Sequence, residues 1–301
     1  MRASEPTVSV IVPCFNSERT IRSCLTSLLD QKTSIPYDVI VVDSSADETP
    51  RIVEREFPTV RLIHLGTKTF AGAARNIGIR ASRVPFCLMI DSDCIAQCDL
   101  IERMIARHRE ARYAAVGGSL RNGTPNSVSG WIGYLLEFKE YTPEAPRRFV
   151  TTLPTANVMY RREALERYGL FDEDIWLGED MLFNWKLTSS GEQILFDPKI
   201  EVTHLNRTGW REVLSYQISL GSTQVTARRR GNGLGLPSGE TVLRYPVLIA
   251  LMPIVRLLRA AIWLAANDRK ALLLFMFVWP MYFLGAAFWS FGFLQGVMNE
   301  D

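Results

Sequence analysis

The sequence has no excess of charge of one sign and no long run of basic residues. Of its 301 residues, 34 are lysine or arginine and 32 are aspartate or glutamate, so the formal net charge is only +2. A chain that binds nucleic acid through its phosphates needs a basic surface. The longest run of basic residues is a short cluster of three, Arg228–Arg230. We therefore expect no nucleic-acid partner.

Cysteine is too sparse and too unevenly placed for a disulfide framework. The five cysteines are an odd number and all lie in the first third of the chain: Cys14, Cys24, Cys87, Cys94 and Cys98. This pattern is typical of a protein in a reducing compartment. A zinc site is disfavoured as well, because no second Cys or His pair with zinc-ligand spacing accompanies Cys94 and Cys98.

The N-terminus also lacks the features of a secretory signal peptide. No charged start followed by a long apolar run is present, since Pro6 and Pro13 bracket an apolar stretch only as long as a strand. We therefore expect the N-terminal part of the protein to stay in the compartment where it is made.

The first third of the chain alternates apolar runs typical of buried strands with segments typical of helices. Strands are expected over 8–12, 39–42, 60–65 and 86–90, and helices over 49–57, over 72–81 and in a stretch ending near 29. This alternation predicts an α/β fold with a mostly parallel sheet covered on both faces. Its right-handed crossovers place the carboxyl ends of the strands at one ligand-binding edge. Asn16, Asp43 and Asp91 each follow a strand and are expected to meet there.

The middle of the chain has weaker patterns. Glycines mark the ends of two expected helices, with Gly169 after the helix 161–168 and Gly191 after the helix 179–190. Two further strands are expected over 193–196 and 200–204, on either side of Asp197-Pro198.

The composition changes sharply after Arg228–Arg230. We expect a domain over 1–230, a glycine-rich linker over 231–242 and a membrane-associated region over 243–301. Residues 271–294 carry no charge and can cross about 30 Å of hydrocarbon, so they predict a transmembrane helix. Pro280 is tolerated in such a helix. A buried core helix is the alternative.

A second apolar stretch, over 245–266, has two interpretations. Arg256 and Arg259 interrupt it, and each arginine costs about 2.5–3.5 kcal/mol near the centre of a bilayer. An interfacial amphipathic helix is favoured, and a second span is the alternative. Arg269 and Lys270 precede the clear span, and this positive flank favours the cytoplasm for the N-terminal domain.

Two acidic motifs carry candidate chemistry. Asp91-Ser92-Asp93 follows a strand directly, and two carboxylates one residue apart can hold Mg²⁺ or Mn²⁺ from one side. Such a metal neutralises charge on a leaving nucleoside diphosphate. An ordinary polar loop is the alternative. Gly178-Glu179-Asp180 begins a helix, where acidic residues suit the helix dipole, but Asp180 is also placed to act as a general base.

The motifs are more specific together than singly, because they follow one another in a particular order along the chain. Taken together they resemble the family 2 glycosyltransferases of the GT-A fold, of the membrane-attached bacterial type. The matching segments are Val8–Asn16, Val41–Thr49, Ala73–Gly78, Asp91–Asp93 and Gly178–Asp180. The resemblance extends from about Val8 to His204. It implies a GT-A fold and transfer of a sugar from a nucleotide-sugar donor.

The resemblance also implies roles for single residues. The nucleotide-sugar site is expected to contain Pro13, Phe15, Glu18, Asp43, Arg75, Asp91, Ser92, Asn157 and Glu179. Within it, the first three line the base pocket, Asp43 contacts the base, Arg75 lies near the donor phosphates or sugar, and Asn157 shapes the donor-sugar and acceptor site. Asp91, Asp93 and His204 are the expected metal ligands, although a lone histidine is as often structural. Asp180 is the expected base.

Two departures from the family pattern refine this expectation. Ser44 stands where the family often has a second aspartate, which weakens the inference about how the nucleotide base is recognised. The Gln-x-x-Arg-Trp motif of processive synthases is not found after Asp180, which favours single sugar addition over polymer synthesis.

The expected activity is therefore inverting, metal-dependent and non-processive. A UDP-sugar is the favoured donor, and a lipid-linked glycan of the cell envelope is the expected acceptor, at the cytoplasmic face of the inner membrane. A catalytically silent scaffold of the same fold would be marked by loss of Asp93 or Asp180, and both are present. A nucleotidyltransferase would need a glycine- and lysine-bearing phosphate loop near the first strand, which the sequence lacks.

Overall fold

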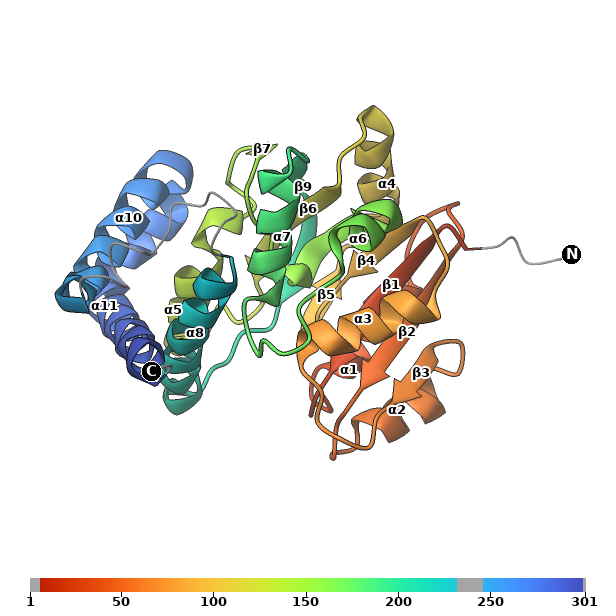
Figure 1. The fold of residues 1–301 in the computed structure, drawn as a ribbon, viewed down its shortest axis with the longest axis horizontal. Helices are drawn as coiled ribbons and strands as arrows, with labels where there is room; N and C mark the ends of the chain where they lie inside the picture. Colours follow the sequence, from red (N-terminus) through yellow and green to blue (C-terminus); the bar gives the residue numbers. More distant parts are fainter. Residues whose placement is uncertain (1–5, 232–245, 300–301) are drawn as a thin grey trace, which may run out of the picture. The chain divides into compact units, whose positions relative to one another are not determined.

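The structure is a computed structural model that describes residues 6–231 and 246–299. By packing, the chain divides into two units (Figure 1). The first unit is formed by Met1–Leu120 with Arg147–Leu205, and the second by Arg121–Pro146 with Asn206–Asp301. The expected domains, 1–230 and 243–301, stay a prediction. The expected linker over 231–242 lies, apart from Gly231, outside the described residues.

A mixed sheet forms the centre of the first unit (Figure 1). Among the described residues its strand order is β3-β2-β1-β4-β8-β6-β9-β5, with β7 beside β9. The strands are β1 Val8–Cys14, β2 Tyr37–Asp43, β3 Arg61–His64, β4 Phe86–Met89, β5 Cys94–Ala96, β6 Ala115–Asn122, β7 Arg148–Phe149, β8 Val158–Arg161 and β9 Ile194–His204. The four strands from the first third, β1 to β4, pair in parallel. The α/β prediction with a mostly parallel central sheet is confirmed, and later strands add antiparallel pairs.

One expectation about the sheet is wrong. Two strands were expected on either side of Asp197-Pro198, but β9 is continuous through both residues. Pro198 has no backbone N–H to donate, which favours a break in a central strand. It lies, however, between Leu195–Phe196, which pair with β7, and Val202–His204, which pair with β5. The strand can therefore continue through the proline.

The expected helices of the first unit begin and end close to the expected positions. They are α1 Ile21–Leu29, α2 Thr49–Glu56, α3 Ala71–Ala81, α6 Arg162–Tyr168 and α7 Glu179–Ser189. The helix α4 Leu100–Glu110 and the short 3₁₀ helix η2 Thr155–Asn157 were not predicted. Gly169 and Gly191 follow α6 and α7 with left-handed backbone angles, as expected for C-terminal caps.

The helix α3 packs closely on β1 and β2, and this contact sets the position of its polar residues. Ile40 and Val42 of β2 are buried against Ala74 of α3. A Cβ on Gly78 would lie 2.5 Å from Cγ2 of Ile11, so the glycine permits this approach. Because side chains alternate along a strand, the equally buried Val39 and Val41 face the other side of the sheet. Both faces are therefore covered, as expected.

The second unit is helical within its described part. It contains α5 Val128–Phe138, η1 Lys139–Tyr141, α8 Trp210–Arg230, η3 Pro246–Leu251, α10 Met252–Asn267 and α11 Arg269–Met298. The backbones of α8 and α11 touch at two glycines. A Cβ on Gly221 would lie 1.9 Å from the carbonyl oxygen of Trp289, and one on Gly292 would lie 1.9 Å from that of Ile218. Small residues allow the same close approach between helices in membranes.

Two helices of the second unit are long and apolar enough to cross a membrane, by length and composition. The longer one, α11, has 30 residues and contains the expected span 271–294. The other covers Leu248–Asn267 and matches the expected helix 245–266. Each also leaves large apolar side chains exposed, including Leu258 and Ile262 on α10 and Met276 and Phe277 on α11.

Candidate active site

The polar residues that follow β1, β2 and β4 meet at one edge of the sheet, as expected. Asn16 accepts a hydrogen bond from the backbone N–H of Ala46 at 3.1 Å, and its own N–H donates to Ser45 Oγ at 2.7 Å. Ser17 Oγ lies 2.7 Å from Ser92 Oγ. These contacts join the loops after the three strands. The carboxyl ends of the parallel strands therefore form a shared polar surface.

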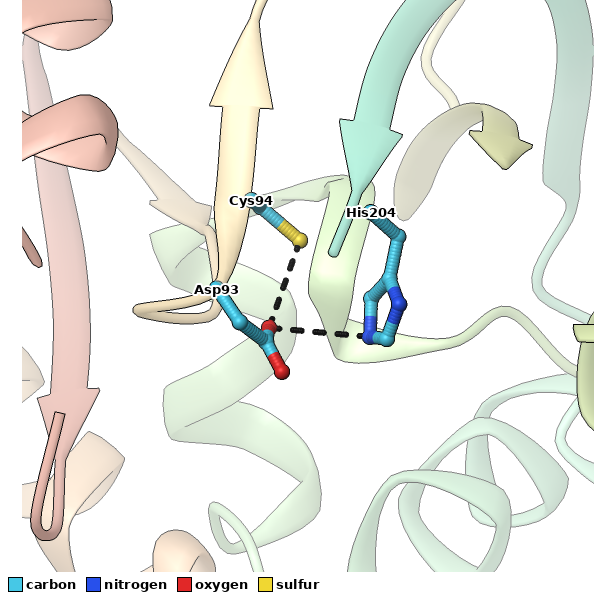
Figure 2. Close-up of side chains that lie close together, drawn as sticks. All are labelled: Asp93, Cys94 and His204. Atoms are coloured by element: carbon cyan, nitrogen blue, oxygen red, sulfur yellow. Dashed lines mark hydrogen bonds and ion pairs between the residues drawn. The ribbon is translucent and has the colours of Figure 1, made fainter. Parts of the chain in front are cut away.

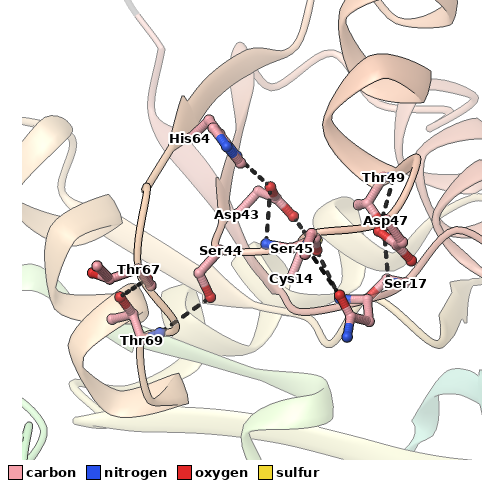
Figure 3. A network of polar contacts seen from close by, with 12 residues as sticks. Cys14, Ser17, Asp43, Ser44, Ser45, Asp47, Thr49, His64, Thr67 and Thr69 are labelled. Carbon is pink, nitrogen blue, oxygen red and sulfur yellow. Dashed lines mark hydrogen bonds and ion pairs between the residues drawn. The ribbon is translucent and has the colours of Figure 1, made fainter.

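Asp43 lies at the centre of a buried network (Figure 3). Its side chain is fully buried, and Oδ1 accepts a hydrogen bond from Ser45 Oγ at 2.5 Å. Oδ2 accepts from the N–H of Ser45 at 3.2 Å and lies 2.7 Å from Nδ1 of His64. His64 was not predicted. It is half-exposed at the end of β3, and the parallel register pairs it directly with Asp43.

The residues expected to surround a nucleotide base lie on the loop after β1. Phe15 is 43% exposed, and Lys68 Nζ lies 4.7 Å from the centroid of its ring. The same Nζ lies 5.9 Å from the ring of the exposed Trp176. Glu18 accepts a hydrogen bond from the N–H of Glu48, at 3.4 Å. Lys68 and Trp176 were missed because no local pattern marks them.

Pro13, another residue expected to line the base pocket, is half-buried within β1.

Asn157, the residue expected to shape the donor-sugar and acceptor site, is fully buried. Its Nδ2 donates to the carbonyl oxygens of Ser119 and Ile200, both at 3.0 Å. Its Oδ1 has no hydrogen-bond partner among the described residues. Asn157 therefore ties η2 to β6 and β9.

Arg75 brings together three carboxylates from distant parts of the chain. It lies on α3 with only 4% of its side chain exposed. Nη2 donates to Asp91 Oδ1 at 2.7 Å, and Nη1 donates to Glu179. Burial alone would lower the pKa of Arg75, but the negative charges of Asp91, Glu179 and the neighbouring Asp180 outweigh it and raise that pKa above its usual value.

The two acidic residues that begin α7 have raised pKa values. Burial raises the pKa of Glu179 to about 7 against the opposing charge of Arg75. Burial also raises the pKa of Asp180, again against the charge of Arg75. Asp180 accepts hydrogen bonds from the N–H of Met181 at 2.7 Å and of Thr155 at 3.4 Å. The arrangement holds two carboxylates of increased basicity beside one guanidinium.

A possible metal site lies at the start of β5 (Figure 2). Asp93, Cys94 and His204 offer ligand atoms that all lie within 4.8 Å of one another. His204 Nε2 lies 3.5 Å from Asp93 Oδ1, because the antiparallel register of β5 and β9 pairs Cys94 with His204. Burial and the nearby charges of Asp93 and Asp91 raise the pKa of Cys94, which keeps it a thiol.

The donor set can hold a divalent ion. The carboxylate of Asp93 suits Mg²⁺ or Mn²⁺, the imidazole of His204 is a nitrogen donor more typical of transition metals, and a thiol is a poor ligand for Mg²⁺ or Mn²⁺. Asp91 is not part of this group, because its carboxylate pairs with Arg75. The expected metal ligands are therefore divided between two neighbouring positions. Asp93 and His204 lie together, and Asp91 lies beside Arg75.

Comparison with known proteins assigns this chain to a family. The family model described as Glycosyl transferase family 2 matches residues 9–169, more than half of the chain. The chain belongs to glycosyltransferase family 2. This family assignment confirms the predicted resemblance and makes the protein a glycosyltransferase.

Curated relatives of this glycosyltransferase come from archaea and bacteria. Glycosyltransferase AglE of Haloferax volcanii is 26% identical over 75% of this chain and 75% of its own length. Succinoglycan biosynthesis protein ExoO of Rhizobium meliloti is 32% identical over 68% of this chain and 62% of its own length. The uncharacterized glycosyltransferase EpsJ of Bacillus subtilis is 29% identical, over 63% and 58%. The chain thus spans about three fifths of the length of the last two.

Solved structures share the fold of this glycosyltransferase. A mannosyltransferase from Pyrobaculum calidifontis, in complex with GDP-Man and Mn²⁺, aligns with a TM-score of 0.61 and 21% identity, over 98% of this chain and 87% of its own. Residues 1–349 of Staphylococcus aureus TarS, in complex with UDP-GlcNAc, align with a TM-score of 0.55 and 19% identity, over 98% and 91%. Both confirm the predicted GT-A fold.

Proposed function

We propose that this glycosyltransferase moves a sugar from a nucleotide-sugar donor to an acceptor hydroxyl in a single displacement that inverts the anomeric carbon. The observation that supports this most directly is the cluster of the buried Arg75 and Glu179 with the half-buried Asp91 and Asp180. It places a cation suited to the donor diphosphate beside a carboxylate suited to removing a proton. Within the described cluster, Asp91 and Glu179 both form ion pairs with Arg75, which leaves Asp180 to act on the acceptor hydroxyl.

Asp180 is the general base in this proposal. A base works best when its pKa lies near the working pH, and burial raises the pKa of Asp180 above that of an exposed aspartate. The opposing charge of Arg75 limits this rise in pKa and favours the ionised carboxylate. Asp180 accepts the proton as the hydroxyl oxygen attacks, while Arg75 stabilises the departing diphosphate.

Asp93 and His204 would hold a divalent ion, Mg²⁺ or Mn²⁺. The Mn²⁺ complex of the related mannosyltransferase fold supports this assignment. When bound, such an ion neutralises negative charge on the leaving diphosphate. Asp91 instead accepts a hydrogen bond from Arg75 and would face the ribose and donor sugar.

The nucleotide would lie over the loops after β1 and β2. Phe15 and Trp176 offer exposed aromatic faces, and Lys68 adds a cation next to both. Pro13, Glu18 and Asp43 would complete the proposed base pocket, and Ser92 and Asn157 would frame the sugar. The GDP-Man and UDP-GlcNAc complexes of fold relatives support a nucleotide-sugar donor. Of these, a UDP-sugar is favoured.

The proposed acceptor is a lipid-linked glycan, to which a single sugar is added. Two apolar helices, α10 and α11, support attachment to the inner membrane with the first unit on the cytoplasmic side. The relative ExoO carries the name succinoglycan biosynthesis protein, which supports a role in envelope polysaccharide or glycoconjugate synthesis.

The first test is thermal stabilisation of the detergent-purified protein by UDP-, GDP- and TDP-sugars, with and without Mn²⁺ or Mg²⁺. We expect stabilisation by one donor class only when metal is present, and its loss in Asp93→Asn. Asp99→Asn, which removes a carboxylate from an exposed ion pair with Arg103, is the matched control. No shift with any donor would favour a catalytically silent scaffold.

The second test concerns the chemistry. Asp180→Asn should retain donor binding but lose about 10²–10⁴-fold in transfer rate. Asp174→Asn changes an exposed carboxylate in the segment before α7 and should retain activity. The product anomer, assigned by NMR, should be inverted relative to the donor. Retention of configuration would contradict the single displacement.

A further inference from the structure

We propose that the second unit contains a binding site for a phosphate or diphosphate group, formed by Lys139, Arg256, Arg259 and Tyr282. The natural ligand in this proposal is the anionic head of a membrane lipid. As the headgroup site for the acceptor, it rests on the function proposed above. As an anion site, it rests only on the contacts within the second unit.

The first element of the site joins η1 to α10. The indole N–H of Trp263 donates to the carbonyl oxygen of Lys139 at 2.9 Å and fixes η1 against α10. Lys139 Nζ lies 4.0 Å from Oε1 of Glu140, and Arg259 Nη2 lies 3.9 Å from the same oxygen. A lysine and an arginine from distant segments therefore share one carboxylate.

The second element is buried hydrogen-bonding capacity without a partner. The guanidinium of Arg256 lies 4.3 Å from the centre of the Trp289 ring on α11. Its Nε is buried and donates to no acceptor among the described residues. The hydroxyl of Tyr282, a fully buried residue of α11, also has no partner in this part of the chain. The two groups interact electrostatically with each other, and Arg259 acts on both. Buried polar groups of folded proteins are almost always hydrogen-bonded, so two unpartnered groups in one cluster indicate a missing acceptor.

The electrostatics of the cluster point to an anion. Burial, together with the positive charges of Arg256 and Arg259, lowers the pKa of Lys139 to about 8. Burial and the charge of Arg259 also lower the pKa of Arg228, at the end of α8. Among the described residues, Glu140 is the only carboxylate that acts on Lys139. A phosphate would neutralise this repulsion, because its several oxygens accept charge-assisted hydrogen bonds from lysine and arginine.

The surroundings favour a lipid as the source of that phosphate. Arg259 is 74% exposed, so the cluster can be reached from outside. On α10 it is flanked by the exposed side chains of Val255, Leu258 and Ile262. Cations beside an exposed apolar stripe match a molecule with an anionic head and a hydrocarbon chain. A free phosphate would use the cations but not the stripe.

The test measures binding of farnesyl diphosphate to the full chain in detergent. EDTA is present and no donor is added, so that metal-dependent binding in the first unit does not contribute. Lys139→Gln and Arg256→Gln should weaken binding about ten-fold or more, as expected for loss of a charge-assisted hydrogen bond. Arg211→Gln, an exposed cation on α8, is the matched control and should stay within about two-fold. Thermal unfolding checks that each variant folds.

Two further variants test diphosphate binding by the cluster if the glutamine variants do not fold. Lys139→Arg retains the charge and should retain binding, whereas Tyr282→Phe removes only the unpartnered hydroxyl and should weaken it. Equal binding by farnesol, or an equal loss in Arg211→Gln, would overturn the proposal. Displacement by inorganic pyrophosphate as strong as by farnesyl diphosphate would support the anion site and overturn the lipid source.

Binding of farnesyl diphosphate can be tested separately from the proposed sugar transfer. Asp180→Asn should bind farnesyl diphosphate like the parent protein while losing transfer. Loss of transfer with binding intact would concern the active site alone. Absence of binding in a protein that still transfers sugar would overturn the anion site alone.

Discussion

Replacing Arg75 by methionine should expose how strongly the active-site cluster depends on one buried charge. Arg75 is 4% exposed and pairs with Asp91 and with Glu179, whose side chain is 6% exposed. Removing one partner of a buried ion pair costs about 3–5 kcal/mol, because the remaining charge stays buried and unpaired. For a unit of this size, that corresponds to a fall in the unfolding midpoint of about 6–20 °C.

The chain offers a matched control on the same helix. Arg80 also lies on α3 and pairs with Glu173 at 2.7 Å, but the two side chains are 58% and 43% exposed. Exposed pairs contribute about 0.2–1 kcal/mol, because solvent screens the charges. Arg80→Met should therefore lower the unfolding midpoint by a few degrees at most.

The stability of Arg75→Met should depend on pH in a direction set by the protonation of Glu179. Glu179 already has a pKa raised to about 7 in the folded protein, against 4.5 as its ordinary value, and loss of Arg75 raises it further. Between 4.5 and the folded value, the folded state keeps a proton that the unfolded state has lost. Stability of the variant should therefore rise as pH falls through this window, and the deficit should be largest above pH 7.

Thermal unfolding of the parent, Arg75→Met, Arg80→Met and Arg75→Met/Glu179→Gln, each at pH 5.5 and 8.0, measures these effects. The double variant should recover part of the lost stability, because it removes one unpaired carboxylate. The reasoning is refuted if Arg75→Met costs no more than Arg80→Met, or if its deficit grows as pH falls.

Three further predictions test the packing of the first unit. Burial lowers the pKa of His108 to about 4 in the folded protein, so between pH 7 and 5 the unfolded state binds a proton that the folded state does not. Over this range the parent should lose about 2 kcal/mol more stability than His108→Gln, measured by unfolding at both pH values, and equal losses would contradict this. Gly118→Ala should lower the free energy of unfolding by more than about 4 kcal/mol or prevent folding, because its Cβ would lie 1.8 Å from a carbonyl oxygen of β9. Gly66→Ala has open space around the new Cβ and should change the unfolding midpoint little. Tyr160→Phe should cost about 1–3 kcal/mol in the same assay, since it removes the donor to the buried Oδ1 of Asn184; a neutral result would mean that Asn184 finds another donor.

The sequence was most informative where one segment determines its own structure. Apolar runs predicted β1, β2 and β4, and the residues after them, Asn16, Asp43 and Asp91, meet as expected. A strand must bury its apolar side chains, and right-handed crossovers then bring the strand ends to one edge. Glycines marked the ends of α6 and α7 for the same local reason, since a left-handed residue suits glycine.

Tertiary structure alone decided which distant residues share a contact. The pair Arg75–Glu179 joins positions 104 residues apart, and His64 reaches Asp43 only because β3 pairs with β2 in one register. The same pairing rules let β9 continue through Pro198, where the local pattern predicted a break. Local periodicity depends on side chains a few residues apart, whereas these contacts depend on the packing of whole strands and helices. The sequence therefore marked candidate chemical residues, and it did not show which distant residues contact them.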